Sequence, residues 1–408
     1  TNGAQNNTIR NNTISLNKTY GSTFGIYSNT NHTLAAPTIS APVTATTGAN
    51  SNNKFYSNAI SNVNMGIALI GCQDINFMDT GNDVGGSSAA TGNTITNWGG
   101  LIQTTSYASS TGTCYGINSD NQKDENISFN TISSAAVSGT AVTMRGIFKD
   151  FNNTPTGTFT STISSNTITI TNNFTSGTME LIRSQGITTP VATATININS
   201  NTLLNNVIGG ASASINFVGI TNTAQCGVLN INSNIIRGTT STATTGGFTG
   251  INNSGAVETT VNINNNQIGN AAGGAITYSV ASSGAIIGIT CPTVAATAAV
   301  SISNNNFQGF VQTVAGSGGH SYIMLTHSAS GATTDNINNN TFTNISANTS
   351  GTVTFITRSG SMALNAGATE NCNNNSIVTA FAKPTAGGNL RLYLGTGTHQ
   401  SGNTQVQT

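Results

Sequence analysis

Few side chains in this sequence could carry acid–base or metal chemistry. Only 5% of the 408 residues are charged, and 11 Lys and Arg offset 11 Asp and Glu, whereas about 25% is usual in soluble proteins. The densest acidic stretch holds Asp74, Asp79 and Asp83, and carboxylates are the ligands that Ca²⁺ prefers. Their spacings of five and four residues fit no compact calcium loop. We therefore expect solvated carboxylates and predict no metal site, with calcium at these three residues as the alternative.

A second acidic cluster, Asp120, Asp124 and Glu125, lies beside Lys123 and is also expected to be a solvated loop. A glycoside hydrolase needs paired carboxylates, and a polysaccharide lyase needs a basic side chain near a metal-bound uronate. Five arginines in different repeats share no constant place relative to the motifs described below; they are Arg145, Arg183, Arg237, Arg358 and Arg391. We predict no catalytic and no cofactor-binding residue. An enzyme remains the alternative, because side chains distant in sequence can meet in space.

The remaining reactive side chains give no stronger signal. His320 lies in a Gly-rich stretch at residues 318–321, where a lone His is usually structural or exposed. The aromatic residues Trp98, Tyr107 and Tyr278 could stack on sugars, but core packing is the commoner role. The five cysteines form no Cys-x-x-Cys pair, which argues against zinc. All five are expected to fill the core: Cys72, Cys114, Cys226, Cys291 and Cys372. Only Cys72 and Cys114 are worth testing as a disulfide.

A short sequence motif is repeated along the whole chain, and the elements that it forms must position the side chains described above. In residues 261–268, Val261 and Ile263 face one side of an extended strand. Ile268 follows Ile263 at an odd spacing of five residues, so a bend must separate them. Three asparagines occupy the bend, and Asn tolerates left-handed backbone angles and can bond its own backbone. Each copy therefore predicts a strand, an asparagine corner and a second strand.

Copies of the motif recur at a nearly constant interval. The apolar residues that close them are 32 to 39 residues apart, at Ile95, Ile132, Ile168, Leu203, Ile236, Ile268, Phe307, Phe342 and Ile377. A Gly-Ile pair recurs between copies, beginning at Gly66, Gly116, Gly146, Gly186, Gly219, Gly250 and Gly288. A fixed period of this length predicts a solenoid.

The composition indicates which kind of solenoid forms. Asn-Gly occurs once and Asp-Gly never, although these pairs are the strongest hairpin signals. No segment keeps a 3.6-residue apolar period. We predict an all-β parallel β-helix, one domain over residues 1–408, with about 11 coils of roughly 35 residues. Asn side chains should stack between coils in a hydrogen-bonded ladder, with the predicted members Asn166, Asn201, Asn234, Asn266, Asn306, Asn340 and Asn375.

The Ile-x-Ile-x-Asn-Asn-x-Ile and Gly-Ile patterns resemble the right-handed parallel β-helix repeats of the pectin-lyase-like superfamily. With its low charge and its loops rich in Thr, Ser, Asn and Gly, nearly the whole chain is similar to repeat regions of large secreted surface proteins of Bacteroidota. This resemblance implies a right-handed solenoid, export by the type IX secretion system, and a role in attachment or gliding motility. The superfamily also includes polysaccharide lyases and glycoside hydrolases. The Asn-Thr-Asp, Asp-Asp, Gly-His-Gly and Arg-Ile-Lys signatures of the hydrolases do not occur in this sequence.

The neutral charge balance lacks the electrostatic footprint of a protein that binds nucleic acid or an anionic membrane. No apolar run approaches the length of a membrane span. We expect a piece of a longer extracellular protein at the bacterial cell surface. Its predicted function is a non-enzymatic rod or adhesive stalk whose loops contact a polysaccharide, a solid surface or another envelope protein.

Ice binding is a third class of function, and it would use ranks of Thr-x-Thr on one flat face. Such pairs begin at Thr94, Thr169, Thr193, Thr352 and Thr396. They fall at different places in their repeats, so no flat rank is predicted.

Overall fold

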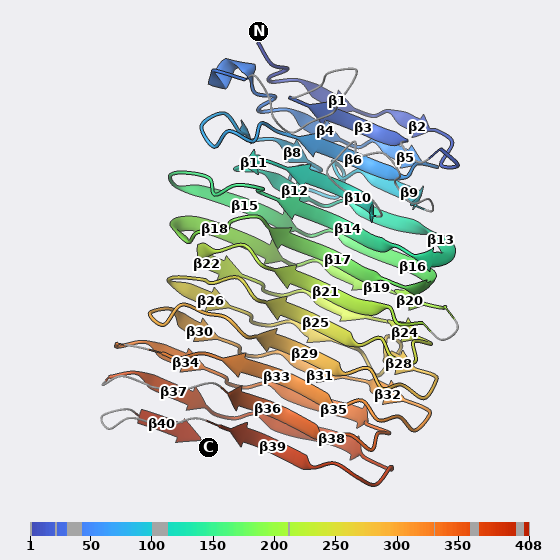
Figure 1. Ribbon diagram of the computed structural model, residues 1–408, viewed down its shortest axis with the longest axis vertical. Helices are drawn as coiled ribbons and strands as arrows, with labels where there is room; N and C mark the ends of the chain where they lie inside the picture. Colours follow the sequence, from blue (N-terminus) through green and yellow to red (C-terminus); the bar gives the residue numbers. More distant parts are fainter. Residues whose placement is uncertain are drawn as a thin grey trace.

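The chain winds into a parallel β-solenoid, as predicted, and its strands stack along one long axis (Figure 1). The computed structural model describes residues 2–20, 23–30, 43–99, 113–210, 213–329, 331–359, 367–396 and 404–407. Each full turn contributes to three sheets, which we call A, B and C in the order in which the chain passes through them. All pairings between named strands are parallel in the described residues, and the one antiparallel bridge joins Asn270 to Gly274.

Sheet A contains the strand before each asparagine corner. Its 12 strands are β1 (Thr8–Arg10), β4 (Lys54–Tyr56), β8 (Asp83–Val84), β12 (Asn126–Ser128), β15 (Phe159–Ser164), β18 (Val191–Asn199), β22 (Cys226–Asn230), β26 (Thr260–Asn262), β30 (Ala299–Ser301), β34 (Thr334–Asn336), β37 (Thr369–Cys372) and β40 (Thr404–Gln407).

Sheet B begins directly after the corner. From β16 to β32 most turns contribute two short segments to it, which gives 15 strands: β2 (Thr13–Ser15), β5 (Ala59–Ser61), β9 (Thr94–Trp98), β13 (Thr131–Ala141), β16 (Thr167–Ser176), β19 (Thr202–Leu204), β20 (Val207–Ile208), β23 (Ile235–Arg237), β24 (Thr240–Ser241), β27 (Gln267–Ile268), β28 (Ile276–Tyr278), β31 (Asn306–Gln308), β32 (Phe310–Gln312), β35 (Thr341–Ser346) and β38 (Ser376–Ala382).

Sheet C carries most of the Gly-Ile pairs. Its 11 strands are β3 (Phe24–Asn29), β6 (Met65–Ile70), β10 (Thr113–Asp120), β14 (Thr143–Asp150), β17 (Thr178–Gln185), β21 (Asn216–Asn222), β25 (Phe248–Asn253), β29 (Ile286–Cys291), β33 (His320–Thr326), β36 (Val353–Ser359) and β39 (Leu390–Gly395). A two-stranded sheet of β7 (Asp79–Thr80) and β11 (Gln122–Lys123) and the 3₁₀ turn η1 (Thr46–Gly48) lie outside these three sheets.

The period of the solenoid can be measured from corner to corner. Between Asn58 and Asn375 the chain makes nine turns of 32 to 39 residues. The turn from Asn12 to Asn58 is longer, at 46 residues. The predicted count of about 11 coils of roughly 35 residues was therefore slightly too high.

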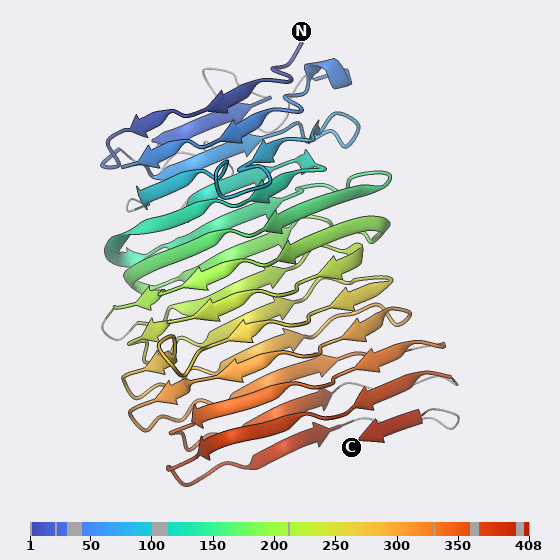
Figure 2. The same cartoon turned by 180° about the vertical axis from the view of Figure 1, so that it is seen from behind.

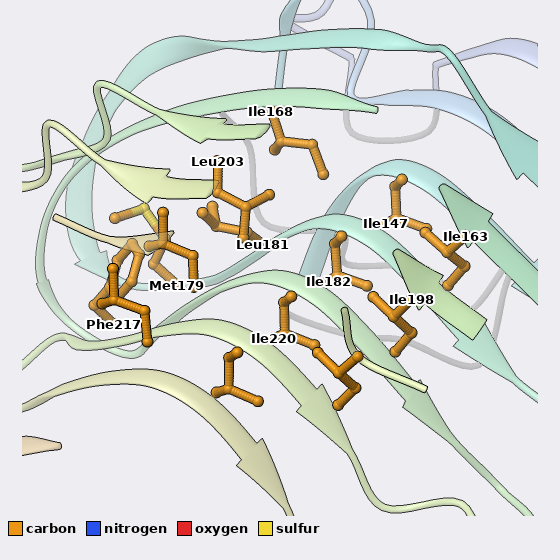
Figure 3. Packing of buried hydrophobic residues seen from close by; sticks show 14 of the residues in the cluster. Ile147, Ile163, Ile168, Met179, Leu181, Ile182, Ile198, Leu203, Phe217 and Ile220 are labelled. Carbon is orange, nitrogen blue, oxygen red and sulfur yellow. The ribbon is translucent and has the colours of Figure 1, made fainter. Parts of the chain in front are cut away.

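One continuous apolar core fills the solenoid from Ile26 to Cys372. Figure 3 shows its construction: Ile147, Ile182 and Ile220 of sheet C stack in one column and face Ile163 and Ile198 of sheet A. In these columns like side chains pack on like in successive turns.

The two sequence motifs pack against each other, which explains the glycine of the Gly-Ile pairs within sheet C. A Cβ on Gly116 would lie 2.6 Å from Ile132 Cγ2, and one on Gly146 would lie 2.7 Å from Ile168 Cγ2. Any larger side chain would therefore collide with the residue that closes the neighbouring motif. The Gly-Ile pair leaves the space that this closing residue fills.

The corner before sheet B requires a left-handed backbone. Its residues have φ near 57°, as in Asn265 (59°), Asn339 (57°) and Ser233 (59°). Asn is the non-glycine residue that adopts this region most readily, which accounts for the runs of Asn at the corners. Phe129 takes the same position with φ 61°.

Candidate functional site

The asparagine ladder is the most regular polar feature of the molecule. Asn234 Oδ1 accepts hydrogen bonds from the backbone N–H (2.9 Å) and Nδ2 (3.1 Å) of Asn201. Asn234 Nδ2 donates to Asn266 Oδ1 (3.1 Å) and to the carbonyl oxygen of Ile198 (2.8 Å). The same arrangement links eleven side chains: Asn12, Asn58, Asn93, Asn130, Asn166, Asn201, Asn234, Asn266, Asn305, Asn340 and Asn375.

One predicted ladder residue, Asn306, lies outside the ladder. Every member is two positions before the inward-facing apolar residue of its motif, and before Phe307 that position is Asn305. Asn304 takes the left-handed corner (φ 59°). Asn306 starts β31, where its Oδ1 accepts a hydrogen bond from Thr341 Oγ1 at 3.2 Å. Three consecutive asparagines have three different roles, so the prediction was off by one residue.

Ionisable side chains that the sequence left scattered meet inside the solenoid at two levels. Towards the C-terminal end, Arg358 of β36 pairs with Asp335 of β34 (Nη2–Oδ2, 2.7 Å) and Glu370 of β37 (Nε–Oε2, 3.2 Å). All three side chains are 0% exposed. Tyr393 Oη donates a hydrogen bond to Glu370 Oε1 (3.0 Å). We call this group, together with His327, the C-terminal network.

His327 completes the C-terminal network. Its Nδ1 lies 3.0 Å from Asp335 Oδ1, and its Nε2 lies 3.0 Å from the carbonyl oxygen of Ala295. A carbonyl and a carboxylate only accept hydrogen bonds, so both ring nitrogens of His327 face acceptors. Both ring nitrogens are occupied and the side chain is 0% exposed, so this His–Asp pair does not face a substrate.

The second level lies nearer the N-terminus. Lys149 of β14 is fully buried, and its Nζ lies 3.4 Å from Glu125 Oε2 and 2.5 Å from the carbonyl oxygen of Gln122. Asp120 and Glu125 are 0% and 2% exposed, so the prediction that they belong to a solvated loop was wrong. Asp124, directly before Glu125, is exposed, as predicted for a solvated loop. We call Asp120, Glu125 and Lys149 the N-terminal network.

Burial shifts the protonation of this N-terminal network. It raises the pKa of Asp120 well above its usual value, and the nearby Asp150 adds to that shift. Burial also lowers the pKa of Lys149. Within the described part of the chain, Asp120 Oδ1 is buried and has no hydrogen-bond partner. A neutral carboxyl is the form of Asp120 that this interior favours.

The charged side chains follow a pattern that sequence analysis missed. Lys149 and Arg358 each stand two residues after the Ile that faces the core, Ile147 and Ile356. Glu125 stands two residues before Ile127 of sheet A. Side chains two residues apart on a strand share a face, so this spacing alone would have placed the three charges inside.

A third polar group lies on the outer face of sheet C. Glu180 of β17 accepts from Arg145 Nε and Arg183 Nη1, both at 2.6 Å. Arg145 also lies over the Phe148 ring, 4.5 Å from its centroid. Gln185 extends the group, since its Oε1 accepts from Arg183 Nε at 2.5 Å. Two of the six arginines therefore converge on one carboxylate, an arrangement the sequence did not predict.

The acidic residues considered for calcium do not converge. Asp79 is buried and accepts hydrogen bonds from Thr30 Oγ1 (2.7 Å) and the Asn50 N–H (2.8 Å), and burial raises its pKa to about 7. Asp83 bonds Tyr56 Oη at 2.5 Å. Asp74 is an exposed turn residue that accepts from the backbone of Asn76. Within the described ranges no three His, Cys, Asp or Glu side chains gather as a metal site.

The other candidate residues are parts of the interior. Trp98 and Tyr278 are 0% and 1% exposed, so neither presents a ring to a sugar; Tyr107 lies outside the described residues. His320 is buried, with its ring nitrogens 3.2 Å from Tyr322 Oη and Gln312 Oε1. The five cysteines are buried free thiols, including Cys72 and Cys114.

A lateral groove of about 450 Å³ lies near the N-terminal end. Successive turns line it with mostly neutral polar side chains, among them Gln5, Thr46, Asn52, Asn76 and Lys123. Lys123 Nζ donates to the carbonyl oxygen of Thr156 at 2.8 Å. The buried carboxylates described above point into the solenoid, so the groove has no paired acids of the kind that cleave glycosides.

Comparison with known proteins adds no relative: no protein family, curated protein or solved structure matches the chain. The fold defines the class as a parallel β-solenoid with an internal asparagine ladder. No helix in the described ranges is long and apolar enough to cross a membrane.

Proposed function

We propose that the chain is a non-enzymatic rod segment of a secreted cell-surface protein, which holds loops at its corners for contact with a surface, a glycan or a partner protein. The observation that carries this proposal is the unbroken ladder from Asn12 to Asn375. Each turn adds about 4.8 Å, so ten steps give a rod of about 48 Å.

The buried ion pairs support a mechanical role. Arg358 joins a strand of sheet C to two strands of sheet A, and Lys149 joins β14 to the segment that leads into β12. Removing one partner of such a pair leaves an uncompensated buried charge. The charges therefore hold the sheets together across the interior instead of serving a catalytic centre.

The groove and corner loops supply the contact surface. The groove is lined by side chains from several consecutive turns, such as Gln5, Asn52 and Lys123. Loops held by a rigid scaffold can vary without loss of the fold. A rod with this construction suits attachment in shear flow, because its backbone hydrogen bonds run parallel to the long axis.

Attachment is the property to measure. Beads coated with the purified chain should be retained on at least one of a panel of polysaccharides, cell walls and mineral surfaces, at shear that removes bare beads. Retention should persist in the presence of a chelator, because the proposed contacts need no metal ion. It should also persist in the variant Asp74→Ala, because the Asp74 carboxylate is not among the side chains that line the groove. Failure on every surface would refute adhesion. Release of reducing sugar or unsaturated uronate would indicate an enzyme instead.

A further inference from the structure

The outer face of sheet B carries a regular array of hydroxyl groups over the first five turns. The strands β2, β5, β9, β13 and β16 stack directly beneath one another in Figures 1 and 2. On each strand two outward-facing residues flank the inward-facing Ile. The strands pair in register, so these residues form two columns across the turns, which we call files. One file is Thr13, Ala59, Thr94, Thr131 and Thr167, and the other is Ser15, Ser61, Thr96, Ser133 and Thr169.

The Thr-x-Thr pairs considered in the sequence analysis do fall at different positions of their repeats, and the array is built otherwise. Thr94 pairs with Thr131, which pairs with Thr167, so the pair Thr167 and Thr169 is in register with Thr94 and Thr96. The sequence from Thr167 to Thr171 contains two overlapping Thr-x-Thr pairs, and only the first of them belongs to the array.

The array is a two-dimensional lattice with fixed spacings. Neighbouring turns are about 4.8 Å apart, and the two files on a strand are about 6.7 Å apart. Nine of the ten positions carry Thr or Ser, and the tenth is Ala59. Thr and Ser make up about a quarter of the chain, so composition alone would place two or three hydroxyls there. Something other than composition has selected these residues.

The fold does not require hydroxyls at these positions. The same files in later turns hold Thr202 and Leu204, then Ile235 and Arg237, then Gln267 and Gly269, then Asn306 and Gln308, and then Thr341 and Thr343. Sheet B forms equally well with these side chains. In the described residues, consecutive turns with Thr or Ser at nearly every position occur in the first five turns, and the later Thr341 and Thr343 pair stands apart from them.

Most of the hydroxyls are unused within the protein. Ser15 Oγ accepts from Asn62 Nδ2, and Thr169 Oγ1 donates to the carbonyl oxygen of Leu204. The other seven have no hydrogen-bond partner among the described residues, and none is fully buried. The array holds no charge and no aromatic ring. It therefore lacks the stacking platform of a sugar-binding face and the cations that would attract a polyanion.

We propose that this face binds ice. The strand and coil spacings of the array are close to the oxygen repeats of an ice surface, and the rigid solenoid fixes them before contact. Hydroxyl groups replace water in that lattice, while the Thr methyl groups exclude mobile water between the files. Preorganisation removes most of the ordering cost of binding. The inference goes beyond the rod and does not depend on any ligand of the corner loops.

The test is thermal hysteresis together with uptake of the fluorescently labelled chain into a growing ice hemisphere. The wild-type chain should show both. The variant Thr96→Tyr places a ring at the centre of the array and should lower hysteresis at least fivefold. The matched control is Thr343→Tyr, which occupies the same file of sheet B in β35, beyond the array. Both sites are half-buried, so the fold should tolerate Tyr at either one. Circular dichroism spectra like that of the wild type would show that both variants fold.

A gain-of-function variant removes the remaining ambiguity. Ala59→Thr fills the one gap in the array, and it should raise hysteresis above that of the wild type. Absence of hysteresis and of ice uptake in the wild type would overturn the proposal, as would equal losses in the Thr96 and Thr343 variants. Retention on crystalline cellulose that is lost in Thr96→Tyr, with no ice activity, would identify a flat polysaccharide as the ligand instead. The bead assay on the corner loops remains a separate test of the rod.

Discussion

At the scale of single residues, asparagine has two different roles at a corner such as residues 304–305. Asn304 takes the left-handed backbone angle, and Asn305 next to it joins the ladder. A ladder amide is fully enclosed and makes hydrogen bonds to the turns on both sides, so it cannot be replaced by another residue without leaving its neighbours unsatisfied.

The variants Asn305→Ala and Asn306→Ala test this distinction with adjacent residues of one type. Asn305→Ala strands the N–H groups of Asn266 and a carbonyl oxygen at Ile263. It should lower the free energy of unfolding by about 1–3 kcal/mol per stranded group. Asn306→Ala should change it by less than about 0.5 kcal/mol. Guanidinium unfolding measures both, and equal effects would contradict the ladder assignment.

His320 predicts how stability depends on acidity. Burial lowers the pKa of His320 to about 4, while an unfolded His titrates near 6.5. Between these values the unfolded state binds more protons, so stability is fully present above about 6.5 and is lost as the pH falls towards 4. The loss should amount to about 3 kcal/mol.

The variant His320→Gln removes that titration and keeps a polar side chain. As the pH falls from 7.5 to 4.5, its unfolding free energy should change in a more favourable direction than that of the wild type, because the loss caused by His320 is gone. The difference between the two proteins isolates His320 from Asp79, whose pKa of about 7 gives a change of opposite sign. Parallel pH profiles would show that His320 does not contribute.

At the scale of elements, the sheets are joined by charges as well as by aliphatic packing. The inner face of sheet C offers Lys149 and Arg358, and sheet A offers Asp335 and Glu370 at the same inward positions. Each ion pair therefore crosses the interior at a level where the aliphatic column is interrupted. The interior accepts these charges because every one of them has a partner.

The variant Arg358→Met keeps the volume of the side chain but leaves Asp335 and Glu370 buried without a cation. It should destabilise the protein by about 3–5 kcal/mol. The control Arg237→Met concerns a half-buried side chain on the outer face of sheet B, and it should cost less than about 0.5 kcal/mol. Thermal unfolding of both variants would decide, and a mild effect at Arg358 would show that the network is not structural.

At the scale of the whole molecule, stability is nearly a sum over turns, because each turn contacts only its neighbours. Whole turns should then be removable. Deletion of residues 202–266 takes out two turns of 33 and 32 residues and joins Asn201 to Gln267. The product should remain folded and be about 10 Å shorter, as measured by small-angle X-ray scattering.

A deletion of about half a turn, residues 202–218, provides the contrast. It would place strands of sheet C where strands of sheet B belong, so the ladder and the aliphatic columns would lose their partners. This variant should fail to give a cooperative unfolding transition. If it folded as well as the whole-turn deletion, the turns would not be the units of the structure.

The sequence determined the repeat, the corner and the core column by itself, because each depends on residues close together in the chain. The odd spacing from Ile263 to Ile268 required a bend, and the bend was rich in the residue that tolerates it. Closing residues such as Ile236 and Ile268 do face inward and pair in register.

Only the tertiary structure decided what the turns bring together. The lengths of the turns vary from 32 to 46 residues, so positions equal in space are not equally spaced in sequence. Arg358 meets Asp335 and Glu370, and Thr94 aligns with Thr131 and Thr167, only after the coils have stacked. Local sequence patterns specify how one turn is built. Contacts between turns depend on the register of the stacked strands, which cannot be read from the sequence because the loops differ in length.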